Sequence, residues 1–253
     1  MQISDNWIDI AYLISAVLFV LGIKGLTKPK TAVRGNLLAA SGMGVACVVT
    51  LLHRDIVTYE IIIGGVIVGG IIGAILAKKV QMTAMPQLVA LLNGFGGGAS
   101  FAVAGAEFFR GGHPDTVGII ATGIAVLIGA VTLTGSFVAF AKLQELIDGK
   151  PMGFPGMKLV NAILLLGSVA AIAYLVIHPL FPPLFFCLSI PSSILGILLV
   201  SPIGGADMPV VIALLNSYSG IAASAAGFVM GNSALIVTYS LMGSSGLILT
   251  QIM

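Results

Sequence analysis

Five residues near the C-terminal end of the chain have types and spacings that could carry chemistry. They are Asp207, Asn216, Ser244, Ser245 and Gly246. Asp207 stands at the mouth of a long apolar stretch, and Asn216 follows it on that stretch about 13 Å deeper, at the rise of an α-helix. Charged and amide side chains are costly in lipid, so polar residues held at such a depth indicate a functional site.

Asp207 is expected at a helix N-terminus, because Pro209 follows it and proline favours the first helical turn. The helix dipole stabilises a carboxylate there, whereas partial burial favours the protonated acid. A group held between these effects can change its protonation when its surroundings move; the alternative is a plain N-cap. Asn216 carries no charge, but its amide can orient water or an imidazole. The alternative role for Asn216 is an interhelical hydrogen bond. The alternative for Ser244 and Ser245 is purely structural: each small side chain allows close packing and bonds to its own helix backbone.

A second polar stripe lies on an earlier apolar stretch. At 100° per residue, one helix face carries Asn93, Gly97, Ser100, Ala104 and Glu107. The stripe would run about 21 Å, could hold water, and could relay protons. The alternative is an interhelical hydrogen bond for Asn93 and an interfacial carboxylate for Glu107.

The elements that must position these residues are membrane helices. The chain is 58% hydrophobic and only 8% charged, and long apolar stretches recur from end to end. We therefore predict an all-α polytopic transmembrane helix bundle, with residues 1–253 forming a single domain. Nine spans are expected, at residues 8–26, 35–52, 57–77, 86–109, 117–141, 159–177, 184–200, 209–230 and 234–252. The seventh is the weakest, because three prolines interrupt it.

Loop charge predicts the orientation. Nine cations follow the odd-numbered spans one, three and five: Lys24, Lys28, Lys30, Arg34, Lys78, Lys79, Lys142, Lys150 and Lys158. The opposite side carries only Arg54 and Arg110. By the positive-inside rule, the N-terminus is outside and the C-terminus and Asp207 are cytoplasmic. His53, His113 and His178 then fall in outer loops.

Small residues predict where helices meet. Gly65, Gly69 and Gly73 recur at four-residue spacing, and so nearly do Gly220, Ser224, Gly227 and Gly231; both runs indicate close helix contact. Cys47 and Cys187 are expected to be buried hydrophobes. The run Gly94-Phe95-Gly96-Gly97-Gly98-Ala99 matches a dinucleotide fingerprint formally, but it lies inside a span without the strand that this motif needs. We expect no catalytic residue, metal site or bound cofactor in this chain, and no nucleic-acid partner.

Several motifs resemble the membrane domain of the β subunit of proton-translocating NAD(P) transhydrogenase. The most specific runs from Gly204-Gly205-Ala206-Asp207-Met208-Pro209 to Leu215-Asn216-Ser217-Tyr218-Ser219-Gly220, and Gly243-Ser244-Ser245-Gly246 is also similar. Arg34-Gly35-Asn36 and Met85-Pro86-Gln87-Leu88-Val89-Ala90 extend the resemblance over nearly the whole chain.

The resemblance implies a function. Members of the family couple hydride transfer from NADH to NADP⁺ to inward proton movement, with NAD(H) and NADP(H) bound by soluble domains. It implies an α-subunit partner with membrane helices and an NAD(H)-binding domain, an NADP(H)-binding domain not contained in this chain, and a homodimer of the whole complex in the bacterial inner membrane. By motif match, Asp207, Asn216, Ser244, Ser245 and Gly246 align with residues of proton transfer or coupling. Many members carry a membrane histidine where this chain has Asn93.

Two other functional classes fit the composition. A secondary transporter would suit polar residues at the midplane, but the two halves show no repeat. A structural anchor for soluble domains would not need Asn216 at depth. If protons do cross here, the chain lacks a residue that titrates near neutrality between Glu107 and Asp207. We therefore expect a partner helix to bring an ionisable residue, most simply a histidine, beside Asn93 and Asn216.

Overall fold

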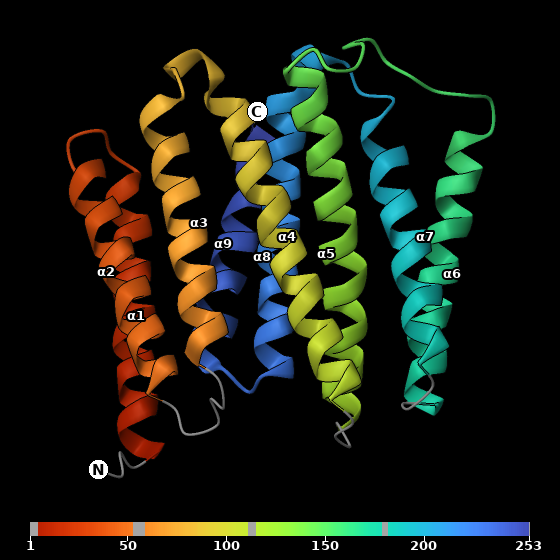
Figure 1. Cartoon of the computed structure of the whole chain (residues 1–253). Coiled ribbons are helices and arrows are strands. Elements are labelled where there is room, and N and C mark those ends of the chain that lie inside the picture. Colours follow the sequence, from red (N-terminus) through yellow and green to blue (C-terminus); the bar gives the residue numbers. More distant parts are fainter. Residues whose placement is uncertain (1–4, 53–58, 111–114, 179–181, 253) are drawn as a thin grey trace. The chain divides into compact units, whose positions relative to one another are not determined.

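The computed structural model describes residues 5–52, 59–110, 115–178 and 182–252, and every long element in these ranges is an α-helix (Figure 1). The helices are α1 (Asp5–Leu26), α2 (Ala32–Leu51), α3 (Tyr59–Lys79), α4 (Met85–Phe109), α5 (Thr116–Leu143), α6 (Met157–Ile177), α7 (Pro183–Val200), α8 (Met208–Val229) and α9 (Ser233–Ile252). Single 3₁₀ turns, η1 (Met82–Ala84) and η2 (Gly205–Asp207), precede α4 and α8. The predicted all-α class is confirmed.

The predicted spans coincide with these helices to within a few residues. Eight helices are long and apolar enough to cross a membrane. The described apolar part of α9, Ser233–Ile248, is shorter, so a ninth crossing stays a prediction, as does the orientation. Pro183 lies in the first turn of α7, and the helix continues through Pro191. A proline at a helix start is favoured and one inside a membrane helix is tolerated, which explains why the seventh span forms.

The chain forms two compact units, Met1–Met82 and Thr83–Met253. In the first unit, α1 and α2 pack as an antiparallel pair through glycines: a Cβ on Gly35 would lie 2.7 Å from the carbonyl oxygen of Gly22. Ser15 Oγ also donates to the Gly42 carbonyl at 2.7 Å. On α3, by contrast, a Cβ on Gly65, Gly69 or Gly73 would meet no atom of this unit within 4 Å, so the helix contact predicted for this run is not formed there.

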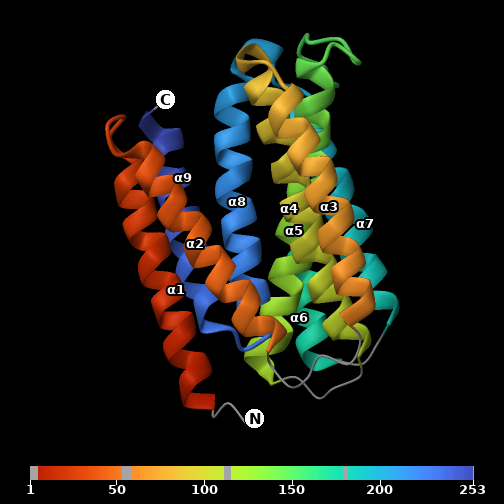
Figure 2. The ribbon, with the colours of Figure 1, turned by 60° about the vertical axis from the view of Figure 1, so that its left-hand side comes forward.

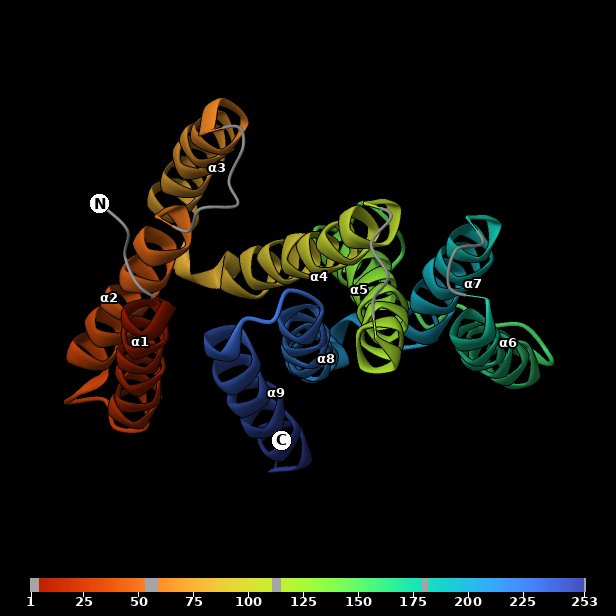
Figure 3. The same ribbon diagram turned by 90° about the horizontal axis from the view of Figure 1, so that it is seen from below.

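The second unit is built around α5, which packs against α4, α6, α7 and α8, while α9 packs on α8 (Figure 3). The α5–α6 and α7–α8 connections lie together at one end of the unit (Figure 2). A buried apolar cluster beneath them joins α4, α5, α7 and α8, and its members are Ala90, Ala139, Val200, Met208, Val211, Ile212 and Leu215. This cluster fixes the start of α8, where Asp207 stands.

The small residues of α8 do form the close contact that their spacing predicts. A Cβ on Gly220 would lie 2.7 Å from the backbone nitrogen of Gly243 on α9, and Ser224 Oγ is 2.8 Å from Ser240 Oγ. Gly231 instead follows the helix with a φ of +64°, a conformation that glycine adopts without strain. Cys47 and Cys187, expected to be buried, are both exposed on the surface of this chain. Each of them therefore lies on the surface of its helix and not in the core of its unit.

Candidate functional site

Asn93 joins three helices. Its Nδ2 donates to Ser136 Oγ on α5 at 2.9 Å, and its Oδ1 accepts from Ser219 Oγ on α8 at 2.6 Å. The Asn93 side chain is buried, and so is Ser136. The donor and the acceptor of this amide are thus both used inside the unit. This arrangement is the interhelical hydrogen bonding that the sequence offered as the alternative role for Asn93. We call Asn93, Ser136 and Ser219 the amide junction.

The rest of the stripe on α4 is a packing surface. A Cβ on Gly97 would lie 2.8 Å from Thr132 Cβ on α5, and Ala104 is completely buried in a cluster with Ala125 and Phe185. Ser100 Oγ donates to the carbonyl of Gly96 within its own helix at 3.2 Å. The stripe therefore lies against neighbouring helices, and a relay role for its residues stays a prediction.

Glu107 lies near the end of α4, where its Oε2 is 3.5 Å from a guanidinium nitrogen of Arg110. This position agrees with the alternative role given for Glu107, that of a carboxylate at the membrane interface. Because α4 and α8 both begin at the end of the unit that carries the α5–α6 connection, Glu107 and Asp207 stand at opposite ends. They cannot exchange a proton directly.

Asp207 ends η2 and occupies the N-cap position of α8, as predicted. Its side chain is exposed and accepts no capping hydrogen bond from the helix. The next residue, Met208, is completely buried and anchors the turn in the apolar cluster. The carboxyl group therefore lies at the helix start, near the positive end of the helix dipole, and does not cap the helix with a hydrogen bond.

Asn216 lies in the middle of α8 and its side chain is exposed, although both neighbours, Leu215 and Ser217, are buried. At 100° per residue, Asn216 falls between Ser219, which faces α4, and Ser217, which faces α9. An exposed amide at this depth is unfavourable against lipid. This sector of α8, between α4 and α9, is thus a surface that requires a polar neighbour.

The predicted residues on α9 lie at the level of Asn216. Ser244 and Ser245 are exposed and donate to the carbonyls of Leu241 and Met242 in their own helix, each at 3.0 Å. A Cβ on Gly246 would collide with the hydroxyl of Ser217. That hydroxyl is buried and has no hydrogen-bond partner among the described residues. Glycine at 246 thus allows α9 to approach α8 at the level of Asn216.

The structure brings Asp207, Asn216 and the three residues of α9 to one helix pair, and it places Asn93 beside α8 through Ser219. Sequence reasoning missed Ser136 and Ser219 as partners of Asn93. Both are serines within apolar spans, and that pattern was the signal available. Among the described residues, no group of histidine, cysteine, aspartate or glutamate could hold a metal ion.

Comparison with known proteins identifies the family. The model of the NAD(P) transhydrogenase beta subunit matches residues 8–253. The chain belongs to this family. Two relatives, each named NAD(P) transhydrogenase subunit beta, come from Rhodospirillum rubrum and from a strain of that species; each is 42% identical over 254 residues, covering 96% of this chain and 54% of the relative. The chain thus spans about half the length of the curated relatives that it matches, and like them it is a membrane protein.

Proton transfer through the helices would need a side chain that titrates near neutral pH. The side chain of Asn93 forms the amide junction. An amide is neutral and neither gains nor loses a proton near neutral pH. His178 follows the end of α6, with its ring centroid 4.6 Å from that of Tyr174. His53 and His113 lie outside the described residues. None of the described polar residues inside the helices of the second unit is a histidine.

The amide junction predicts a stability difference between two substitutions on one face of α4. Asn93→Ala leaves the hydroxyls of Ser136 and Ser219 without the amide and opens a cavity, so it should lower the free energy of unfolding by about 2 kcal/mol. Ser100→Ala, the matched control, removes only a bond within one helix and should change it by less than about 0.5 kcal/mol. Thermal unfolding of both variants in detergent measures the difference; equal midpoints would contradict the junction.

Proposed function

We propose that this chain is the proton-conducting membrane part of an enzyme that couples hydride transfer from NADH to NADP⁺ to inward proton movement. The family membership supports this proposal. The single observation that carries it is α8, which presents an uncapped carboxyl group at its start and an exposed amide at its middle. Hydride transfer itself, and the binding of NAD(H) and NADP(H), belong in this proposal to soluble domains on the cytoplasmic side of the inner membrane.

In this mechanism Asp207 is the coupling group. It lies at the cytoplasmic end by the charge of the loops, where an NADP(H)-binding domain would dock. A carboxyl group without a capping bond can gain or lose a proton without breaking an internal hydrogen bond of the helix. Docking of the soluble domain changes the exposure of the group, and exposure changes its proton affinity. Nucleotide state and protonation are thereby linked at one residue.

The partner subunit supplies the step that this chain lacks. Both polar atoms of the Asn93 amide are engaged within the unit, so the free amide in the middle of the membrane is that of Asn216. A membrane helix of the α subunit would lie against α8 between α4 and α9 and place an ionisable side chain, most simply a histidine, beside Asn216. Asn216 would orient that side chain or its water. A secondary transporter would instead need a solute-binding cavity at this surface.

Asp207→Asn tests the coupling role. The variant keeps the size of the side chain and removes its titration, so the assembled complex should lose proton-linked transhydrogenation by about a hundredfold. Hydride exchange between bound nucleotides, which needs no proton transfer, should continue. The rates of both reactions are measured on the same preparation, and their ratio shows whether the variant is uncoupled.

Glu145→Gln is the control for this experiment. Glu145 is another exposed carboxylate at the same end of the unit, in the connection that follows α5. Its neutralisation should leave both reactions unchanged. A fully coupled Asp207→Asn variant would reduce Asp207 to a residue of the turn and would remove the coupling step from the proposal.

Cross-linking tests the partner at Asn216. In a chain without its native cysteines, Asn216→Cys carrying a photoreactive maleimide should cross-link to a membrane helix of the α subunit. Leu166→Cys on α6, which is also exposed, should give no such product. Replacing the ionisable residue on the captured helix should abolish proton translocation and leave this chain folded. Cross-links only to lipid, or a captured helix without an ionisable residue, would exclude the partner mechanism.

A further inference from the structure

Lys142, in the last turn of α5, is a buried cation that the proposed mechanism does not use. Only 2% of its surface is exposed. Its ammonium group donates to three backbone carbonyls: those of Ser201 at 2.5 Å, Ile203 at 2.7 Å and Lys150 at 3.3 Å. An ammonium group has three N–H donors, so all three are satisfied. The charge is held by backbone dipoles.

These carbonyls belong to two different connections. Lys150 lies in the α5–α6 connection, whereas Ser201 and Ile203 lie in the α7–α8 connection, immediately before η2 and Asp207. The Ser201 carbonyl also stands at the C-terminus of α7, where the helix dipole favours a cation. A charge-assisted hydrogen bond is about twice as strong as a neutral one. Lys142 thus binds the segment that leads into Asp207 more strongly than neutral loop contacts would.

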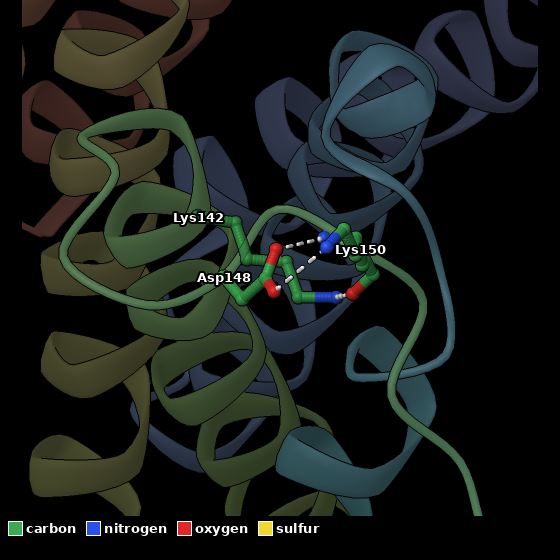
Figure 4. A network of polar contacts seen from close by, with 3 residues as sticks. All are labelled: Lys142, Asp148 and Lys150. Carbon is green, nitrogen blue, oxygen red and sulfur yellow. Dashed lines mark hydrogen bonds and ion pairs between the residues drawn. The ribbon is translucent and has the colours of Figure 1, made fainter.

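Further bonds join the same two connections. The Gly205 N–H donates to the Gly149 carbonyl at 2.8 Å, and the Met152 N–H donates to the Ser201 carbonyl at 3.0 Å. Beside these bonds, Asp148 accepts from the backbone N–H of Lys150 at 3.0 Å and pairs with its exposed ammonium group (Figure 4). We call the three bonds of Lys142, together with the two backbone bonds between the connections, the lysine clasp. Without the ammonium group, the carbonyls of Ser201, Ile203 and Lys150 lose the charge that draws them together.

The clasp and the apolar cluster hold the Asp207 turn from its two sides. Residues 201–205 are bound to the clasp, and Met208 is completely buried. Asp207 stands between them with no side-chain bond to the helix. Its position is therefore set by its neighbours in the chain.

We propose that Lys142 is the positioning residue of the Asp207 turn: its ammonium group holds the α7–α8 connection in the geometry from which Asp207 acts. The consequence for coupling rests on the function proposed above. The structural claim, that loss of the ammonium group releases the turn, does not depend on that function.

Thiol labelling tests the structural claim. In the assembled complex with Cys47 and Cys187 replaced by alanine, a cysteine is introduced at the exposed Ala206, beside Asp207. Lys142→Met keeps the length of the side chain and removes its donors, and it should raise the labelling rate at position 206 by roughly tenfold, since losing hydrogen bonds to a charged group shifts a local equilibrium by at least that factor. Lys150→Met is the matched control. It removes an exposed lysine of the same loop but keeps the carbonyl that Lys142 binds, and it should leave the rate unchanged.

Lys142→Arg provides a second variant, which keeps the charge but presents a planar fork in place of three convergent donors. Its labelling rate should lie between those of the wild type and Lys142→Met, and it decides the question where Lys142→Met does not assemble. A wild-type rate in Lys142→Met, or in Lys142→Arg where only that variant assembles, overturns the inference.

Activity separates this inference from the proposed function. Lys142→Met should lose proton-linked transhydrogenation severalfold while keeping hydride exchange between bound nucleotides, with partial recovery in Lys142→Arg and none lost in Lys150→Met. If Asp207→Asn stays coupled while labelling rises in Lys142→Met, the proposed function fails and the clasp stands. If Asp207→Asn uncouples the complex and labelling does not change in Lys142→Met, the clasp fails and the proposed function stands.

Discussion

A polar group inside a membrane must find a polar partner, because lipid offers none. This constraint separates polar residues of the second unit that find a partner within it from Asn216, which is exposed. Asn93 is satisfied by Ser136 and Ser219, and the exposed serines of α9 bond to their own backbone. Asn216 finds no such partner on its own surface of α8. The satisfied residues build the frame, and Asn216 marks a surface at which the frame is incomplete.

The frame itself depends on close approach between helices. Gly97 brings α4 against α5, and Gly220 brings α8 against Gly243 of α9. Such contacts let van der Waals packing hold membrane helices together where the hydrophobic effect contributes little. They also fix the level at which Ser217, beside Asn216 in the sequence, and Gly246 meet. The proton path that we propose along α8 is therefore bordered by a closely packed helix, α9, at the level of its middle.

The sequence predicted the helices well and their faces poorly. Apolar stretches and prolines locate the nine α-helices of the described residues, and Pro209 correctly places Asp207 at a helix start. The spans, however, are apolar nearly all round, so no periodic pattern shows which side meets a neighbour. For that reason the burial expected for Cys47 and Cys187 was wrong, and the contact expected along α3 is not formed within its own unit. The small residues of α8 were read correctly because polar serines broke the pattern.

The partners of Asn93 and of Lys142 could not be derived from sequence. Ser136 and Ser219 lie 43 and 126 positions away from Asn93, and the carbonyls that bind Lys142 carry no signal in the residue type. Such bonds depend on how helices are arranged, which spacing along the chain does not determine. Lys142 looked like one more cation of the cytoplasmic loops, and only its burial distinguishes it.

In the function proposed here, this chain conducts protons under the control of nucleotides bound elsewhere. Proton flux tests this function in vesicles that contain the complex of this chain with its partner subunit and the nucleotide-binding domains. The account predicts inward proton movement that accompanies NADH-dependent reduction of NADP⁺ and stops when NADP(H) is withheld. Proton movement that ignores the nucleotides, or transhydrogenation that moves no protons, would contradict it.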